Sequence, residues 1–294
     1  MTVIPAATRK SGNSWLIEIL ECPHCGGELV VKDEILACRQ CSSSYPFTDG
    51  IPRFTKPPQN LRPSEKYERG PQVGTPWRQA NWRFLEEQLK QISPGAHLLD
   101  VGAGRGDFAN LTQNHLCVAL DIYPYPEIDI ICDLTQINPF RTGSLDAILL
   151  MNVLEHVYDT HALFRGLARI LAPGGLLILA IPFMVKMHQV PIDFVRYTHF
   201  ALAEIAKDHG LEIMLLEGYY DPVFFLGEGL GNLRNSILPD LKRRQRYLIR
   251  PALAGIEVLR KWIGTVLGPG KSIPPGGTRS LAPTGYQVVF RKKH

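Results

Sequence analysis

Four of the six cysteines stand in two pairs of the form C-x-x-C. Cys22 and Cys25 make the first pair, Cys38 and Cys41 make the second, and twelve residues separate the two. Two residues between cysteines let both thiolates of a tight turn face one ion, so two such turns complete a tetrahedral, closed zinc site that would be structural. A pair of disulfides or a redox site is the alternative. The matched pairs and the lack of a secretory signal favour zinc.

A glycine-rich segment is the second candidate for chemistry. It has the pattern G-x-G-x-G behind an acid, in the residues Asp100, Gly102, Gly104 and Gly106. Glycines let the backbone turn sharply and approach a ligand, and a following helix, expected through Leu111, would offer free N–H groups. Asp121 comes about 20 residues on, where a ribose diol would be held. A nicotinamide-binding fold is the alternative, but its G-x-G-x-x-G pattern is absent.

Polar side chains follow two later apolar segments and are candidates for a general base or for binding a substrate. His156 follows the segment 145–152, and a group follows the segment 172–182: His188, Asp193, Arg196, Tyr197 and His199. Purely structural roles are the alternative. His156 would then bond to backbone, Asp193 and Arg196 would pair, and Thr198 would cap a helix over 200–208.

Alternating apolar segments predict the elements that hold these residues. We expect strands near 97–101, 117–122, 128–133, 145–152, 172–182, 211–219 and 285–291, and helices over 77–92 and 162–171. The fifth strand is apolar throughout, which is typical of a parallel strand buried on both faces. The order predicts a doubly wound α/β sheet with its ligands at the carboxyl ends of the strands.

From about residue 75 onward, these motifs resemble the class I S-adenosylmethionine-dependent methyltransferases. D-V-G-A-G-R-G is similar to their first motif, and L-A-P-G-G-L-L-I-L to their fifth strand. The resemblance implies a seven-stranded Rossmann-like sheet and S-adenosylmethionine as cofactor. It also implies that the cofactor is held by Asp100, the three glycines, Asp121, Ile122, Asp133, Leu134 and Asn152. The segment 188–198 is similar to an H-x-x-P-x-D-x-x-R-[YF]-[ST] stretch of these enzymes, which implies catalytic or substrate-binding roles for His188, Asp193 and Arg196. The segment 145–156 is similar to their fourth-strand motif, and it adds His156 as a catalytic candidate.

Residues 15–55 resemble the small zinc-ribbon activator subunits of certain RNA and protein methyltransferases. The likeness rests on C-P-x-C, C-x-x-C and the ending Y-P-x-x-D-G-I-P. A Pro-rich stretch over 56–64 has the composition of a stiff linker. We therefore expect a zinc ribbon over 1–60, a linker and leading helix over 61–95, and a methyltransferase domain over 96–294.

The net charge of +4 hides an uneven distribution. Residues 231–294 hold 13 Lys/Arg against Asp240 and Glu257 only, and this segment falls mostly in an insertion over 221–284. Behind Pro251, an apolar stripe at helical spacing predicts a basic amphipathic helix: Ala252, Ile256, Leu259, Ile263 and Val266. Three roles are open for this helix. Its apolar stripe would pack on the domain, the helix would lie on an anionic membrane surface, or its basic side chains would bind RNA.

Together, the patterns predict a methyltransferase with a small-molecule, lipid or glycan acceptor. An RNA methyltransferase is the first alternative, and a non-catalytic scaffold with a vestigial pocket is the second. The Asn/Asp-Pro-Pro-aromatic motif of enzymes that methylate exocyclic amines is absent after residue 151. No apolar run reaches the roughly 18 residues of a spanning helix, and the start lacks a signal-peptide core. We therefore expect a cytoplasmic protein, peripheral to membranes at most, whose oligomeric state the sequence leaves open.

Overall fold

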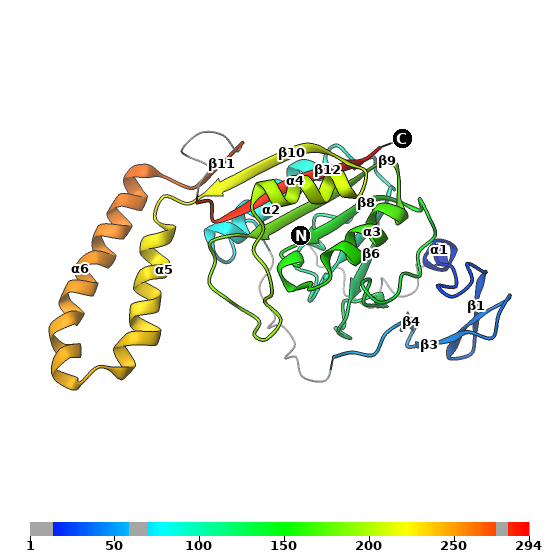
Figure 1. Cartoon of the computed structure of the whole chain (residues 1–294), viewed down its shortest axis with the longest axis horizontal. Coiled ribbons are helices and arrows are strands. Elements are labelled where there is room, and N and C mark those ends of the chain that lie inside the picture. The colour runs from blue at the N-terminus through cyan, green and yellow to red at the C-terminus, as the bar shows by residue number, and fades with distance from the viewer. Residues whose placement is uncertain (1–13, 59–69, 275–281, 294) are drawn as a thin grey trace.

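The structure is a computed structural model that describes residues 14–58, 70–274 and 282–293. Its first part, residues 14–55, is here called the cysteine module (Figure 1). A short helix is followed by four antiparallel strands in the order β1-β2-β3-β4. Their bounds are α1 Ser14–Glu18, β1 Leu29–Lys32, β2 Ile35–Cys38, β3 Ser44–Thr48 and β4 Ile51–Pro52. A tight turn at Asp33, which has a φ of 52°, joins β1 to β2.

The cysteine module packs directly on the larger part of the chain. Backbone hydrogen bonds join Glu21 N to Pro139 O at 2.8 Å and Phe54 N to Ile131 O at 2.9 Å. Buried side chains of the module, among them Leu20 and Leu36, share one hydrophobic cluster with the main sheet. The module is therefore seated on the edge of that sheet.

The main sheet has eight strands in the order β11-β10-β12-β9-β8-β5-β6-β7. Strands β7, β6, β5, β8 and β9 are parallel, while β12, β10 and β11 pair antiparallel. The bounds are β5 His97–Val101, β6 Leu116–Asp121, β7 Ile130–Ile131, β8 Leu145–Met151, β9 Leu171–Pro182, β10 Leu211–Tyr220, β11 Lys271–Ile273 and β12 Gly285–Lys292. The seven expected strands are all present, and β11 adds an edge strand from within the insertion.

Helices cover both faces of this sheet. The bounds are α2 Pro76–Leu89, α3 Thr160–Ile170 and α4 His199–Asp208. Side chains alternate along the strands, so Leu99 and Ile148 belong to the cluster under α3 and α4, while Leu98 and Ala147 belong to the cluster under α2. Two cores on opposite faces make this a doubly wound α/β fold, as predicted.

Two local expectations were wrong. No helix follows the glycine loop, because Gly106, Ala109 and Leu111 each donate their N–H to the residue three positions earlier, which makes a series of turns. Positive φ angles of 55° at Gly104 and 69° at Gly106 lie outside the helical region. The third strand is only two residues long, since the Asp129 carboxylate accepts the Ala119 N–H at 2.9 Å beside it.

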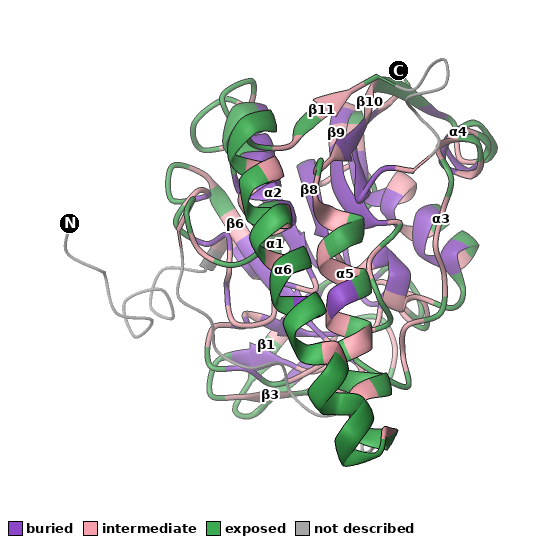
Figure 2. Cartoon of the chain, turned by 90° about the vertical axis from the view of Figure 1, so that its left-hand side faces the viewer, coloured by how far each residue is buried: buried purple, intermediate pink, exposed green. Residues whose placement is uncertain are grey.

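The insertion forms a helical hairpin, residues 224–267, that projects from one end of the sheet (Figure 1). It consists of α5 Phe224–Asn232, two short helical turns, Leu233–Ile237 and Leu238–Asp240, and α6 Arg243–Leu267. Leu253 is the only residue of α6 that is buried, and Figure 2 shows most of this helix exposed. The interpretation that its apolar stripe packs on the domain is therefore wrong. Among the described helices, none has the length and apolar composition that crossing a membrane requires.

Candidate active site

The glycine loop between β5 and β6 is shaped by left-handed backbone. Gly102 has a φ of 69°, and a Cβ added there would lie 2.5 Å from Val153 Cγ2. The Gly102 N–H donates to Leu120 O at 2.8 Å, and the Gly104 N–H donates to Asp121 Oδ2 at 2.9 Å. The loop therefore folds over the end of β6, and only glycine fits its first turn.

Asp121 ends β6 and is 8% exposed. Burial raises the pKa of its carboxyl above the ordinary value, although backbone N–H groups of Tyr123 and Gly104 donate to it. A carboxylate offers about four acceptor positions, so capacity remains for the hydroxyl groups of a ligand. This donor set fits the ribose of an adenosine-containing cofactor.

A cavity of about 940 Å³ opens at the carboxyl ends of β5, β6 and β8. Its wall includes seven residues predicted to hold the cofactor: Gly102, Gly104, Asp121, Ile122, Asp133, Leu134 and Asn152. The other two predicted residues are not in the wall, because Asp100 is buried within β5 and Gly106 lies farther along the loop. The wall also includes His156, Tyr158, Gln189, Ile192 and Phe194.

Asn152 is held by a chain of buried amides. With a φ of 56°, it accepts a hydrogen bond from Trp77 Nε1 at 2.8 Å on Oδ1, and Asn81 Nδ2 lies 3.5 Å from the same atom. Gln287 Nε2 of β12 donates to Asn81 Oδ1 at 2.9 Å, and Ser272 donates to Gln287 Oε1 at 2.7 Å. The chain joins α2, β8, β11 and β12 behind the cavity.

Three of the four predicted catalytic residues, His188, Asp193 and Arg196, lie on the segment between β9 and α4, and the fourth, His156, follows β8 and contacts this segment. The Asp193 carboxylate is paired with Arg196, whose Nη2 donates to Oδ2 at 2.7 Å, and it also accepts the His188 N–H at 2.8 Å. Burial would raise the pKa of Asp193, but these bonds lower it to about 2. His156 Nδ1 lies 2.9 Å from Ile192 O. The ion pair and the backbone bond of the structural interpretation are thus both present.

Glu155 is the residue of this group that sequence reasoning missed. Its side chain is fully buried, and its Oε1 lies 3.7 Å from His156 Nε2 and 3.6 Å from His188 Nε2. The Glu155 carbonyl also accepts the Phe194 N–H at 2.8 Å, so it anchors the predicted substrate segment. A glutamate buried next to His156 had no signal in the sequence, because its burial depends on the fold of residues 188–195.

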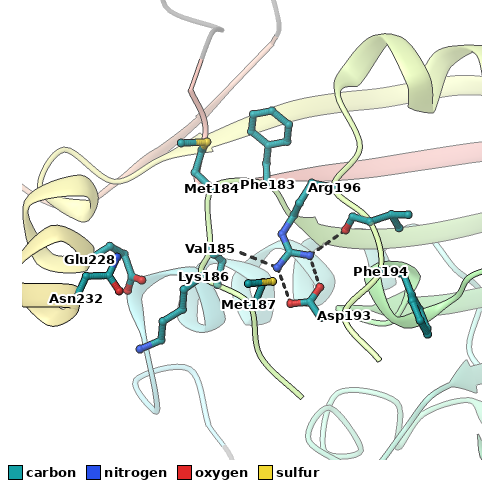
Figure 3. A pocket seen from close by; sticks show the side chains of 11 residues that line it. Phe183, Met184, Val185, Lys186, Met187, Asp193, Phe194, Arg196, Glu228 and Asn232 are labelled. Carbon is teal, nitrogen blue, oxygen red and sulfur yellow. Dashed lines mark hydrogen bonds and ion pairs between the residues drawn. The ribbon is translucent and has the colours of Figure 1, made fainter. Parts of the chain in front are cut away.

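A second, smaller cavity of about 400 Å³ lies between this segment and α5 (Figure 3). Phe183, Met184 and Met187 give it an apolar wall, and Glu228 and Asn232 of α5 lie across from the Arg196–Asp193 pair. Phe194 lines both cavities. The base of the helical hairpin and the large cavity are therefore neighbours.

The cysteine cluster has the geometry of a tetrahedral metal site. Its Sγ atoms are 3.7 Å apart for Cys22 and Cys41, and 3.5 Å apart for Cys25 with each of Cys38 and Cys41. Four sulfurs about 2.3 Å from one zinc ion would be about 3.8 Å apart. The Gln40 N–H donates to Cys38 Sγ at 3.3 Å, as expected for a partly charged thiolate. The four residues fit a zinc ion.

Sequence comparisons agree with the fold. Residues 76–216 match the family model described as a methyltransferase domain. A human protein named "Probable tRNA methyltransferase 9B" is 28% identical over 110 residues, which are 33% of this chain and 24% of the human protein. A ubiquinone biosynthesis O-methyltransferase of Xanthomonas oryzae pv. oryzae is 34% identical over 104 residues, which are 29% of this chain and 43% of that protein. The chain thus spans less than half the length of either relative.

Among solved structures, a SAM-dependent methyltransferase from Archaeoglobus fulgidus is similar over 73% of this chain and 94% of its own, with 15% identity and a TM-score of 0.46. The order of the sheet, the glycine loop and the family match define the class of the larger part of the chain. It carries a class I S-adenosylmethionine-dependent methyltransferase domain.

Proposed function

We propose that the protein transfers a methyl group from S-adenosylmethionine to a small-molecule or lipid-linked acceptor bound in the large cavity. One observation carries this proposal. The wall of this one cavity contains both the glycine loop with Asp121 and the segment ending in Phe194. A volume of about 940 Å³ is at the upper end for ligand sites, which suits two ligands that meet.

The cofactor would lie along the loop, with its ribose on Asp121 and its adenine near Asp133 and Leu134. Bound there, S-adenosylmethionine supplies an activated methyl group. The acceptor attacks in line, so that the carbon–sulfur bond breaks as the new bond forms and its electron pair stays on sulfur. An acceptor hydroxyl would lose its proton to solvent. The protein mainly aligns the two partners, which is the larger part of such catalysis.

The helical hairpin favours a lipid-linked acceptor. On α6, a second apolar stripe, which shares Leu259 and Val266 with the predicted one, is 52–80% exposed: Tyr247, Leu248, Val258, Leu259, Trp262 and Val266. The exposed Arg243, Arg244, Arg246 and Arg250 lie at the start of the same helix. Apolar and aromatic residues beside arginines are what an anionic lipid surface binds. The second cavity at the base of α5 would then receive the acceptor next to Phe194.

Calorimetric titration tests the enzyme class. The protein should bind S-adenosylmethionine and S-adenosylhomocysteine, and NAD is the control that should not bind. Labelled methyl donor with extracted lipids and small molecules then identifies the acceptor. If neither sulfur compound binds, the scaffold alternative replaces the proposal.

Binding to vesicles tests the lipid surface. Wild-type protein should sediment with vesicles of phosphatidylcholine and phosphatidylglycerol, and Val258→Glu should weaken this at least about ten-fold, because it puts a charge into the apolar stripe. Val31→Glu is the matched control, since Val31 is 46% exposed in the cysteine module, away from the hairpin. Binding to a tRNA pool but not to vesicles would contradict the lipid interpretation and favour the RNA alternative.

We also propose that the four cysteines hold one structural zinc ion. Each chain should contain about one zinc, measured by elemental analysis. Cys38→Ser with Cys41→Ser should remove it and expose residues 14–55 to proteolysis, because binding of the metal and folding of such a module are coupled. Cys117→Ser, on β6, is the control. A folded native protein without zinc would contradict the proposal.

A further inference from the structure

Three side chains, of which His156 lies in the wall of the large cavity, point their ligand atoms toward one place. Glu155, His156 and His188 each offer one ligand atom, and these atoms all lie within 4.8 Å of one another. The two histidine rings meet edge to face, with centroids 4.9 Å apart. Among the described residues, neither Glu155 Oε1, Glu155 Oε2 nor His156 Nε2 has a hydrogen-bond partner, although all three atoms are buried.

The opposite ring nitrogens of both histidines face oxygen atoms. His156 Nδ1 lies 2.9 Å from Ile192 O, and His188 Nδ1 lies 3.3 Å from both Lys186 O and Asp193 Oδ2. Since carbonyl and carboxylate oxygens only accept, each Nδ1 carries the hydrogen. In the neutral rings, both Nε2 lone pairs then face the Glu155 carboxylate. Acceptors that face each other in a buried place are stabilised by a proton or a metal cation between them, and the Glu155 carboxylate accordingly raises the pKa of His188.

We propose that Glu155, His156 and His188 bind a divalent first-row transition-metal ion at the wall of the large cavity. Two histidines and one carboxylate with open positions are an established ligand set for such ions. Ligands about 2.1 Å from a tetrahedral ion are about 3.4 Å apart, close to the 3.6 and 3.7 Å between Glu155 Oε1 and the two Nε2 atoms. Histidine ligands usually donate their second N–H to a carbonyl or carboxylate, as both do in this site.

Arg196, which follows Asp193 on the same segment, does not replace such an ion. The guanidinium of Arg196 donates to both oxygens of Asp193 and to the carbonyls of Val185 and Val195. These hydrogen bonds hold the guanidinium of Arg196 against Asp193 and the backbone, and none of them is to Glu155. The three-residue cluster is also distinct from the cysteine site, because its ligands are nitrogen and oxygen rather than sulfur, which suits Mn²⁺ as well as Zn²⁺.

The position of the ion next to the large cavity indicates a role in activating the acceptor, an inference that rests on the proposed function. His156 is in the wall of the large cavity, so open coordination positions would face the acceptor. An acceptor oxygen bound to the ion loses its proton more easily. The oxygen–carbon bond then forms as the carbon–sulfur bond breaks, and the hydroxyl proton goes to solvent. The acceptor is thus inferred to be a hydroxyl compound.

A titration of the full chain with Mn²⁺ tests the site without any activity assay. Bound Mn²⁺ is measured by the loss of the paramagnetic resonance signal of the free ion. We expect one Mn²⁺ per chain beyond the zinc of the cysteine module. Glu155→Gln and His188→Ala should each weaken Mn²⁺ binding at least about ten-fold, because even outer partners of metal ligands contribute that much. Unchanged thermal unfolding and S-adenosylmethionine binding show that either variant is folded.

His161→Ala is the matched control. His161 Nδ1 lies 3.1 Å from His209 Nε2, so these residues also form a histidine pair. Among the described residues, this pair belongs to no group of three possible metal ligands. This variant should bind Mn²⁺ like the wild type. Absence of Mn²⁺ binding in the wild type, or equal binding in the wild type and both cluster variants, overturns the metal site. Mn²⁺ binding without S-adenosylmethionine binding supports the site and overturns the proposed function instead.

Discussion

The side-chain hydroxyl of Thr55 accepts a hydrogen bond from the backbone N–H of Asp133 at 3.0 Å. Thr55 ends the cysteine module, and Asp133 lies in the wall of the large cavity. One residue earlier, the Phe54 N–H donates to Ile131 O, and Pro58 is itself part of the cavity wall. The module therefore contributes directly to the surface on which the cofactor is proposed to lie.

Thr55→Val should weaken binding of S-adenosylmethionine. The substitution keeps the shape but removes the acceptor of the Asp133 N–H, and an unpaired buried donor costs about 1–3 kcal/mol. We expect a several-fold rise in the dissociation constant by calorimetry. Thr55→Ser keeps the hydroxyl and should bind almost like the wild type. Equal affinity of both variants would mean that the module does not support the cavity.

Gly102→Ala tests the shape of the glycine loop. Alanine at positive φ costs about 1 kcal/mol, and here its Cβ would also lie 2.5 Å from Val153 Cγ2. Gly210 has a similar φ of 67° with open space around it, so Gly210→Ala measures the backbone cost alone. In urea unfolding, Gly102→Ala should lose clearly more stability, and it should also lose cofactor affinity. Equal losses in the two variants would argue against the tight contact with Val153.

Lowering the pH should weaken the binding of S-adenosylmethionine and, at the same time, raise the stability of the protein without cofactor. Burial raises the pKa of Asp121 above its ordinary value near 3.8. The folded state therefore takes up a proton before the unfolded state does, so stability rises as pH falls through the raised pKa. Protonation also removes a charged acceptor from the ribose. Asp121→Asn should abolish both pH dependences, as followed by thermal unfolding and calorimetry between about pH 4 and 7.

Gln287→Leu should destabilise the protein by about 1–3 kcal/mol, since it leaves the Asn81 amide and the Ser272 hydroxyl without their partner. Asn81→Leu should cost a similar amount. The double variant should cost less than both together, because residues in one network are coupled by about 0.5–3 kcal/mol. Urea unfolding of the four proteins measures this. Strict additivity would mean that the amides do not act as a network.

The sequence was a good guide to elements whose signal is local. Thr198 caps α4 by accepting the Ala201 N–H, as its place before an apolar stretch predicted. The expected helix after Gly106 was wrong, because the backbone there forms successive turns in which the Ala109 and Leu111 N–H groups donate to the residue three positions earlier. Period and composition give no warning of this, since the residues after Gly106 are compatible with a helix.

Long-range relationships were harder to predict. Asp193 and Arg196 are only three positions apart in the sequence, and their ion pair was expected as the structural alternative to a catalytic role. Glu155 and His188, in contrast, are 33 positions apart in the sequence. Similarly, the apolar stripe of α6 looked like a packing surface because its periodicity is that of a buried helix. Whether such a stripe meets a core depends on where the hairpin leaves the sheet, which the periodicity does not encode.

The amide chain behind the cavity also constrains the order in which the protein is completed. Asn152 directly follows β8, but the chain of bonds that fixes it runs to Gln287 on β12, which comes after all the other described strands in the chain. Until that strand inserts between β9 and β10, the sheet has two unpaired edges at its centre. A nascent chain would therefore hold the glycine loop and Asp121 well before it holds a finished cavity. Cofactor capture would then require β12, since truncation before residue 285 would remove both this strand and the anchor of Asn152.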